Sequence, residues 1–453
     1  MLAEGAKGEH RTAITPDVVP LLTKAGLDVV VQRGAGLKSL IADAALTAAG
    51  ATIADGMEAA DLDVVLHVAP LPTRLAARLP VGCVTIGFCA PSTELETIAA
   101  LRDARVTSFA VELIPRISRA QSMDALTSQA LVGGYRATLE AAMRLPRFFP
   151  LFMTAAGTVP PAKVLVLGAG VAGLQAIATA RRLGAVVSAY DVRPSSAEEV
   201  ASMGATFVTL DLESLEGSGG YAREMTEERS ARQRDLLAPY IAESDVVITT
   251  AAVPGRRAPL LVTTDMLRGM KPGSVVVDLA AETGGNVEGV VAGSETPVPL
   301  DGGGAVTLVG LQDVPSTMAA DASRLYARNV ANLLLLMTKG GVVNPDFDDE
   351  IVAGACLTHD GVVRHEPTAA ALQAAGAGES VAASAAADPV TADSVSDAAA
   401  SDATAGDSAA AEPDAPAPTQ PVPAATQPVG GSREPGPASS EPHSRPETEG
   451  DDA

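Results

Sequence analysis

The chain has 453 residues and a mass of 45.6 kDa, which at roughly 100–200 residues per domain suits two or three domains with substantial cores. Its formal net charge of −23 argues against a nucleic-acid partner and against a polybasic membrane anchor, because both contacts need a basic surface. Three cysteines, Cys83, Cys89 and Cys356, are too few for a disulfide framework and favour a reducing, cytoplasmic setting, and the sequence holds no His/Cys cluster typical of a metal site.

Short apolar segments alternate with helical patterns along the first part of the chain. Helical spacing is present, for example, in Ile41–Ala49 and Leu95–Ala104. The strands expected beside such helices are Val29–Gln32, Val64–His67, Val84–Phe88 and Val106–Val111. This alternation predicts a parallel sheet with helices on its faces.

A second series of strands begins near Lys163, after a long Ala-rich stretch. That stretch, Ser122–Met143, predicts a helix that connects two domains, although Gly133 and Gly134 interrupt its pattern. The expected strands of the second series are Lys163–Leu167, Val186–Tyr190, Thr206–Thr209, Val246–Thr249, Ser274–Asp278 and Val306–Val309. A further helix is expected over Ser316–Thr338, where the chain would return to its first domain.

We therefore predict an α/β fold with two doubly wound parallel-sheet domains joined by long helices. The first domain would span residues 1–125 and be completed by residues 315–345, and the second would span residues 126–314. Residues 367–453 differ in composition, with 14 acidic and 2 basic residues, one leucine, no isoleucine and no aromatic side chain. Such a segment buries too little apolar surface to offset its ordering entropy, so it is predicted to be a disordered acidic tail.

The sharpest motif is a glycine-rich turn. Gly168, Gly170 and Gly173 form a GxGxxG pattern between the expected strand Val164–Leu167 and the helical segment Leu174–Leu183. In this context the first glycine allows a tight turn, the second lets a pyrophosphate approach the backbone, and the third allows helix and strand to pack closely. The pyrophosphate would meet the free N–H groups at the start of the helix. The pattern predicts a Rossmann-like dinucleotide-binding domain.

An acidic residue is expected about 20 positions after such a turn, at the end of the next strand. Asp191 follows Val186–Tyr190, and its carboxylate would accept hydrogen bonds from the adenosine ribose hydroxyls and repel a 2′-phosphate. Arg193 lies two residues later, and an arginine there can bind a 2′-phosphate. Because Asp191 stands at the strand end, we expect NAD rather than NADP.

A polar stretch at the start of the connecting helix gathers Arg116, Gln121 and Asp124. An arginine and a carboxylate at this spacing can clamp a flat ring that carries an amide, and a glutamine can both donate and accept hydrogen bonds. The same residues also suit an ordinary solvated loop. Taken alone, the residue types leave both interpretations open.

Four segments of the chain together resemble one family. They are PRISRAQSMDALTSQA from Pro115, MTAAGTVPPAK from Met153, VLVLGAGVAGLQAIATARRLGA from Val164 and AYDVRP from Ala189. On these segments, residues 8–341 closely resemble the NAD(H)-binding component of proton-translocating NAD(P) transhydrogenase, a family to which alanine dehydrogenase is related.

The resemblance implies that NAD(H) binds to this chain and NADP(H) to a partner subunit, with direct hydride transfer between them. It also implies a homodimer on the cytoplasmic side, peripheral to the cell membrane, whose membrane-spanning partner subunits couple the transfer to proton movement. Arg116, Gln121 and Asp124 match the loop that orients the nicotinamide, with Ile117 and Ser118 as nucleotide contacts beside them. No general base is needed, because the protein contributes positioning and the exclusion of water.

The same resemblance implies further nucleotide-binding positions. They are Gly168, Gly170, Val171 and Gly173 at the turn, Asp191, Val192 and Arg193 at the ribose, Gly220 and Tyr221 in a mobile loop, Gln233 in the next helix, and Ala252 at a strand end. The chain departs from the family at its start, where a short strand is missing or degenerate, and at Thr127, where a serine is common. Residues 281–286 resemble another family segment, to which we assign no role.

Two other functions are alternatives to that of a transhydrogenase component. Alanine dehydrogenase shares the two-domain plan but binds its keto acid through a lysine and a histidine, and those positions hold Val68 and Phe88 here. His67, beside the lysine position, is expected to be a partly buried histidine of the sheet. A non-enzymatic NAD-sensing protein is the second alternative, although a sensor has no need to present the edge of the nicotinamide.

Overall fold

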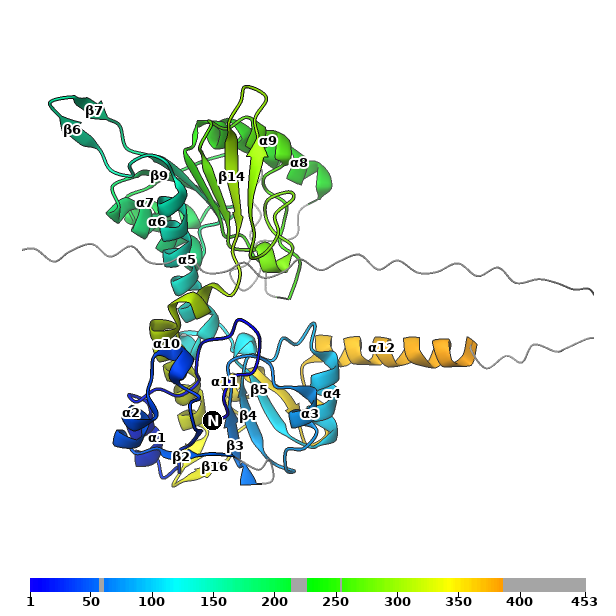
Figure 1. The fold of residues 1–453 in the computed structure, drawn as a ribbon. Helices are drawn as coiled ribbons and strands as arrows, with labels where there is room; N and C mark the ends of the chain where they lie inside the picture. Colours follow the sequence, from blue (N-terminus) through cyan, green and yellow to red (C-terminus); the bar gives the residue numbers. More distant parts are fainter. Residues whose placement is uncertain (57–60, 213–225, 253–254, 386–453) are drawn as a thin grey trace, which may run out of the picture. The chain divides into compact units, whose positions relative to one another are not determined.

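The computed structural model describes residues 1–56, 61–212, 226–252 and 255–385 (Figure 1). In these residues the chain has the predicted α/β fold, with two main sheets in which parallel pairing dominates. Among the helices of these ranges, none is long and apolar enough to cross a bilayer.

The first sheet has five strands in the order β18-β17-β5-β4-β3. Its parallel part consists of β3 (Val64–Leu66), β4 (Val84–Gly87) and β5 (Thr107–Ala110). A separate parallel pair is formed by β1 (Val30–Gln32) and β2 (Thr52–Ala54). The helices of this part of the chain are α1 (Val19–Lys24), α2 (Asp43–Ala48), α3 (Thr73–Ala76) and α4 (Leu95–Asp103).

Two strands of the first sheet come from the far end of the described chain. β17 (Cys356–His359) runs antiparallel beside β5, and β18 (Val362–Val363) pairs with β17. The first sheet is therefore completed by residues after 345, which the predicted boundaries left out. β17 follows α11 (Glu350–Ala355) directly, so no turn residue marks its start in the sequence.

The first residue of the chain continues the pairing of β1. The Met1 amino group donates a hydrogen bond to the Val30 carbonyl at 2.6 Å, and the Gln32 N–H donates to the Met1 carbonyl at 3.0 Å. These two backbone bonds stand where the family resemblance implies a short strand.

The second sheet has seven strands in the order β10-β9-β8-β11-β12-β14-β13, and all neighbours are parallel except β13 and β14. Its strands are β8 (Lys163–Leu167), β9 (Val186–Tyr190), β10 (Thr206–Phe207), β11 (Val246–Thr249), β12 (Val275–Asp278), β13 (Glu295–Pro299) and β14 (Ala305–Gly310). Its helices are α6 (Val171–Arg182), α7 (Ser196–Ser202), α8 (Glu227–Glu243) and α9 (Thr264–Arg268). The six parallel strands have the order of dinucleotide-binding folds.

The central strands of the second sheet, β8, β11 and β12, are buried on both faces, which explains their mainly apolar sequences. In β8, Val164 and Val166 belong to the core on one face, whereas Leu165 and Leu167 belong to the core on the other. β13 was not predicted because two of its five residues are prolines, which sheets tolerate at an edge.

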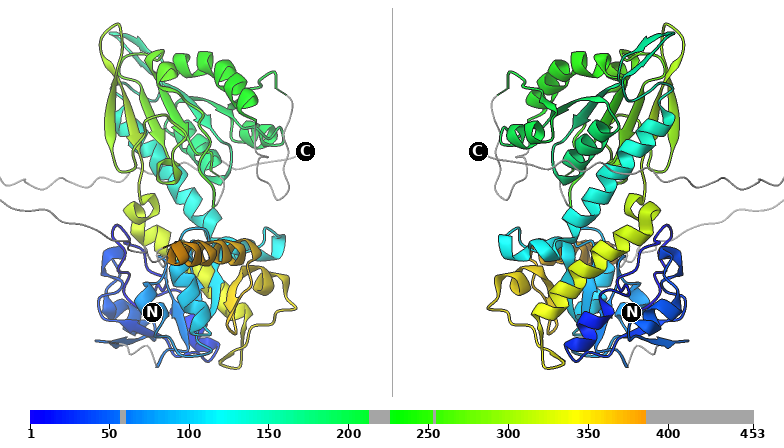
Figure 2. Two further views of the ribbon diagram at one scale, coloured as in Figure 1. Left: turned by 90° about the vertical axis from the view of Figure 1, so that its right-hand side faces the viewer. Right: turned by 90° about the vertical axis from the view of Figure 1, so that its left-hand side faces the viewer.

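Two long helices, α5 (Ala125–Arg144) and α10 (Ala319–Leu336), contact each other and are drawn in cyan and yellow in Figure 2. α10 contributes buried side chains such as Tyr326 and Val330 to the core of the first sheet. The glycine pair does not interrupt α5. A Cβ at Gly134 would lie 2.0 Å from the Ala172 carbonyl oxygen, so this glycine permits the close packing of α5 on α6.

The chain after α10 forms the hairpin of β15 (Thr338–Lys339) and β16 (Val342–Val343), then α11, the two strands described above, and α12 (Glu366–Ala385). The prediction that the tail starts at Pro367 is wrong for its first residues, because they are helical. Thr368 is buried and donates a hydrogen bond to the Pro91 carbonyl at 3.1 Å, and Leu372 packs against Ile98 and its neighbours. These contacts offset the ordering entropy of the first turns. Residues 386–453 lie outside the described residues.

Candidate functional site

The glycine-rich turn joins β8 to α6 as the sequence predicts. Gly168 has a φ of +99°, which a residue with a side chain rarely adopts, and a Cβ at Gly173 would lie 1.8 Å from the Gly168 carbonyl oxygen. Gly170 precedes α6, and apart from its chain neighbours no heavy atom of the described residues lies within 4 Å of the place where its Cβ would be. Among these residues no side chain caps this helix end. The exposed backbone there fits a pyrophosphate group.

Asp191 holds the other side of this turn. Its Oδ2 accepts a hydrogen bond from the Ala169 N–H at 2.8 Å, and its Oδ1 accepts one from the Arg193 N–H at 2.9 Å. The Arg193 guanidinium also donates to both carboxylate oxygens, each at 3.0 Å. The acceptor positions of Asp191 are therefore filled, and a ribose hydroxyl that binds this carboxylate must displace Arg193.

A small pocket of about 120 Å³ lies beside Asp191. Its lining includes Tyr190, Val192, Phe207 and Arg229. Gln233 is buried and donates a hydrogen bond from its amide to the Tyr190 hydroxyl at 3.2 Å, so it holds this lining side chain in place. Burial raises the pKa of Tyr190 to about 12, which keeps this hydroxyl protonated. An apolar pocket with a few polar groups beside the ribose carboxylate suits an adenine ring.

Asn286 holds together the carboxyl ends of β11 and β12, a role that the sequence did not predict. Its Oδ1 accepts from the Ala251 N–H at 3.0 Å, and its amide donates to the carbonyls of Ala251 and Pro259, each at 2.8 Å. The buried Asp278 accepts from the Asn286 N–H at 2.7 Å, and burial raises the pKa of this carboxyl. Asn286 thus orders the segment that carries the exposed Ala252. The only sequence indication was that Asn286 belongs to residues 281–286, a segment that resembles the family and to which no role was assigned.

The polar loop with Arg116, Gln121 and Asp124 lies immediately before α5. Arg116 and Gln121 are exposed, whereas Asp124 is half-buried and is the N-cap of α5. The Asp124 carboxylate accepts from the Thr127 N–H at 2.9 Å and from the Thr127 hydroxyl at 2.7 Å. Thr127 therefore supplies the hydroxyl that the family's serine would provide.

The loop and the glycine turn are connected through α5. Asp124 caps the start of this helix, and Gly134 contacts the first turn of α6. Ten residues separate them, which at 1.5 Å per residue is about 15 Å along the helix axis. Helix α5 thus ties the two groups of predicted residues into one framework. Ile117, half-buried, and the exposed Ser118 lie on the same loop.

Two of the predicted nucleotide-binding residues, Gly220 and Tyr221, fall outside the described residues. Within the ranges that are described, no group of three or more His, Cys, Asp or Glu side chains could hold a metal ion.

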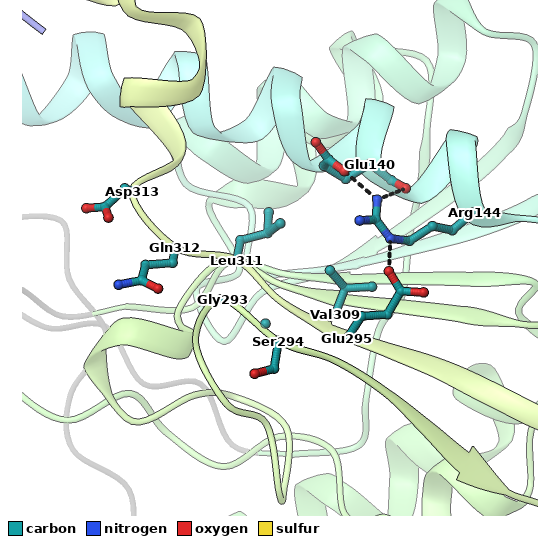
Figure 3. Close-up of a pocket in the computed structure, with 10 residues that line it drawn as sticks. Glu140, Arg144, Gly293, Ser294, Glu295, Val309, Leu311, Gln312 and Asp313 are labelled. Atoms are coloured by element: carbon teal, nitrogen blue, oxygen red, sulfur yellow. Dashed lines mark hydrogen bonds and ion pairs between the residues drawn. The ribbon is translucent and has the colours of Figure 1, made fainter. Parts of the chain in front are cut away.

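A larger hollow of about 490 Å³ lies between α5, β13 and β14 (Figure 3). Arg144 donates there to Glu140 and Glu295, and Asp313 adds another carboxylate, so this lining does not suit a pyrophosphate.

The positions that distinguish alanine dehydrogenase carry no positive charge here. Val68 is fully buried, and the Phe88 ring stacks on Tyr326 with centroids 5.4 Å apart. Burial lowers the pKa of His67 to about 4, so its imidazole is neutral at physiological pH. Arg11 is nearby, over the Phe88 ring, but it is paired with Glu9.

Substitution of Asp191 by asparagine is expected to raise the dissociation constant of NADH about 10-fold, because a charge-assisted hydrogen bond is lost. The substitution should also reduce the preference for NADH over NADPH, because the carboxylate that repels a 2′-phosphate is lost. Titration of each nucleotide by its fluorescence measures both values. The matched control is Asp211→Asn, which removes the same charge from an exposed carboxylate near the pocket. Equal selectivity in D191N and D211N would contradict the role of Asp191.

The strand order, the glycine turn and Asp191 define the fold of an NAD-related oxidoreductase. The family model of the alanine dehydrogenase/PNT N-terminal domain matches residues 1–133. The family model of the alanine dehydrogenase/PNT C-terminal domain matches residues 137–366. The chain therefore belongs to the alanine dehydrogenase/PNT family, which implies NAD(H) binding.

Within this family the chain is similar to transhydrogenase subunits over most of its length. It is 46% identical over 376 residues to an NAD(P) transhydrogenase alpha subunit of Rhodospirillum rubrum, covering 80% of this chain and 96% of that protein. Identity to alanine dehydrogenase of Mycobacterium tuberculosis is 32% over 294 residues, with coverage of 63% and 73%. The crystal structure of transhydrogenase from Sinorhizobium meliloti superposes with a TM-score of 0.68 at 45% identity, covering 80% of this chain and 98% of that one.

Proposed function

We propose that this chain is the NAD(H)-binding component of a proton-translocating NAD(P) transhydrogenase. It binds NAD(H), exchanges a hydride directly with NADP(H) on a partner subunit, and works with membrane-spanning subunits that couple the exchange to proton translocation. The observation that carries this proposal is the attachment of the polar loop and the glycine turn to the same helix, α5, in a chain that is 46% identical to a transhydrogenase alpha subunit.

The described residues fit NAD(H) in three places. The open backbone at Gly170 would accept the pyrophosphate, Asp191 would accept the ribose hydroxyls once Arg193 is displaced, and the pocket lined by Tyr190 would hold the adenine. Arg116, Gln121 and Asp124 would hold the nicotinamide amide and orient its ring. When bound, the nicotinamide supplies the hydride chemistry, and this chain contributes orientation and the exclusion of water.

The first experiment is a transfer assay with the full chain. NADPH and an oxidised NAD analogue of distinct absorbance are mixed with this protein, with and without the NADP(H)-binding partner subunit. Reduction of the analogue that needs both proteins supports the proposal. Absence of reduction while NADH still binds contradicts it, and oxidation of alanine would then identify a dehydrogenase.

We also propose a homodimer, peripheral to the cytoplasmic face of the membrane through its partner subunits. The hairpin of β6 (Phe152–Thr154) and β7 (Gly157–Val159), labelled in Figure 1, is exposed along both strands. Apolar side chains gather on and before it: Met153 is 74% exposed, and the rings of Phe148 and Phe152 lie 4.6 Å apart. An exposed apolar surface of this kind suits a second copy of the chain.

The double substitution F152S/M153S is therefore expected to convert the dimer to a monomer, since it removes apolar surface from the contact. Light scattering during size-exclusion chromatography should give twice 45.6 kDa for the wild type and 45.6 kDa for the variant. Leu40→Ser is the control, because Leu40 is 87% exposed and lies outside the hairpin. A dimer that survives the double substitution would place the interface elsewhere.

A further inference from the structure

The polar loop is held by residues that lie far along the chain. The side-chain amides of Asn329 and Asn332, on α10, both donate hydrogen bonds to the Ser122 carbonyl, each at 2.9 Å. Ser122 lies between Gln121 and Asp124. The two asparagines therefore act on the backbone of the loop, from positions 207 and 210 residues later in the sequence.

Asn329 is poorly explained by packing alone. It is only 7% exposed, it stands among the apolar residues of α10, and its Oδ1 is buried without a hydrogen-bond partner in the described part of the chain. A buried polar atom without a partner costs about 1–3 kcal/mol, so an apolar residue would suit this position better. The hydrogen bond from its amide to the Ser122 carbonyl explains why an asparagine stands here, since an apolar side chain could not make it.

A second attachment comes from α11. The Arg119 guanidinium forms a bidentate pair with the Asp349 carboxylate, at 2.5 and 3.0 Å. Arg119 is 51% exposed, so this pair contributes little to stability. The two parallel hydrogen bonds of the guanidinium nevertheless restrain the position of residue 119 relative to α11. Asp349 also accepts the Ile351 N–H at 2.8 Å and thereby caps α11.

The remaining attachments are apolar. Ala120 and Met123 are buried in the core of the first sheet, whereas Arg116 and Gln121 are exposed. Buried residues that anchor the loop thus alternate with exposed polar residues over positions 116–124. The loop is fixed through its backbone, its apolar side chains and the Arg119–Asp349 pair, whereas Arg116 and Gln121 lie on its exposed side.

We propose that Asn329, Asn332 and the Arg119–Asp349 pair are positioning residues for hydride transfer. They hold the loop so that Arg116, Gln121 and Asp124 present the nicotinamide in the geometry that the transfer needs. They touch neither the substrate nor the cofactor. This inference rests on the proposed function and adds to it the contribution of α10 and α11.

The double variant N329L/N332L removes both amides while keeping the number and branching of the side-chain heavy atoms. We expect the rate of transfer to fall about 10-fold, because a displacement of about 1 Å at the reacting groups has effects of this size or larger. The affinity for NADH should change by about twofold or less, since most of its contacts belong to the glycine turn and Asp191. Amide hydrogen exchange over residues 118–124 should become faster.

The variant Asp349→Ser tests the ion pair separately. Serine still caps α11, so the helix is kept while the pair with Arg119 is lost. We expect a smaller loss of transfer rate, about threefold, with unchanged melting temperature and faster exchange over the loop. The control is Arg324→Ala, which removes an exposed arginine of α10 that pairs with Asp321 on the same helix, away from the loop.

Two results would overturn the inference. One is wild-type transfer and wild-type exchange of residues 118–124 in folded N329L/N332L and D349S. The other is a loss of NADH affinity equal to the loss of rate, which would show a role in binding. If the wild type itself transfers no hydride with its partner, the proposed function fails, whereas the exchange measurement still tests whether the anchors hold the loop.

Discussion

Replacement of Gln121 by alanine is expected to slow hydride transfer about 100-fold and to change the affinity for NADH by about twofold or less. Gln121 is exposed on the polar loop, and its backbone carbonyl accepts the Asp124 N–H at 3.4 Å, a bond that alanine keeps. The substitution therefore removes only the amide. Because transfer needs the two rings at close range and in register, the loss appears in the rate rather than in binding.

The measurement combines the transfer assay under single-turnover conditions with an NADH titration of the same preparation. Gln373→Ala is the matched control, because it deletes the same side chain from an exposed position on α12. If Q121A lowers affinity and rate by the same factor, the residue contributes to uniform binding and not to orientation.

Asp124 gives a less direct test than Gln121, although the sequence groups them together. Its carboxylate caps α5 through two bonds to Thr127, and loss of such a cap costs about 1 kcal/mol of stability. Asp124→Ala would therefore combine a structural loss with any loss of nicotinamide contact. Asp124→Ser keeps a cap acceptor and removes the charge, so it separates the two contributions.

The six parallel strands of the second sheet could be predicted because their local sequences carry the signal. β8, β9 and β11 have the expected bounds, since mainly apolar runs are typical of a parallel sheet covered on both faces. β13 and β17 could not be predicted in this way. The first contains two prolines, and the second is a short antiparallel addition from the far end of the chain.

The same distinction holds for the site. The glycine turn and Asp191 are recognisable because a spacing of about 20 residues within one βαβ unit is a local pattern. The pairing of Asp191 with Arg193, the burial of Gln233 and the clamp made by Asn286 follow from side-chain directions that no spacing specifies. The attachment of the loop to α10 joins residues more than 200 positions apart, which periodicity does not report.

The largest structural effect is expected from Gly173→Ala. A Cβ there would lie 1.8 Å from the Gly168 carbonyl oxygen and 3.1 Å from the Thr250 hydroxyl, and the first neighbour is backbone that cannot rotate away. Overpacking of this kind lowers the free energy of unfolding by about 3 kcal/mol, which corresponds to a fall of about 5–10 °C in melting temperature. Because the turn must move, the affinity for NADH should fall about 100-fold or more.

Gly170→Ala separates nucleotide binding from packing at the same turn. Gly170 has φ −76° and ψ −169°, which alanine adopts freely, and apart from its chain neighbours its Cβ would meet no heavy atom of the described residues within 4 Å. The melting temperature should stay unchanged, whereas the affinity for NADH should fall about 10-fold, because a methyl group would occupy the approach of the pyrophosphate. Thermal unfolding and NADH titration of both variants decide the matter. Wild-type binding by G170A would mean that the pyrophosphate lies elsewhere, and an unchanged melting temperature for G173A would mean that α6 does not pack on the turn as described.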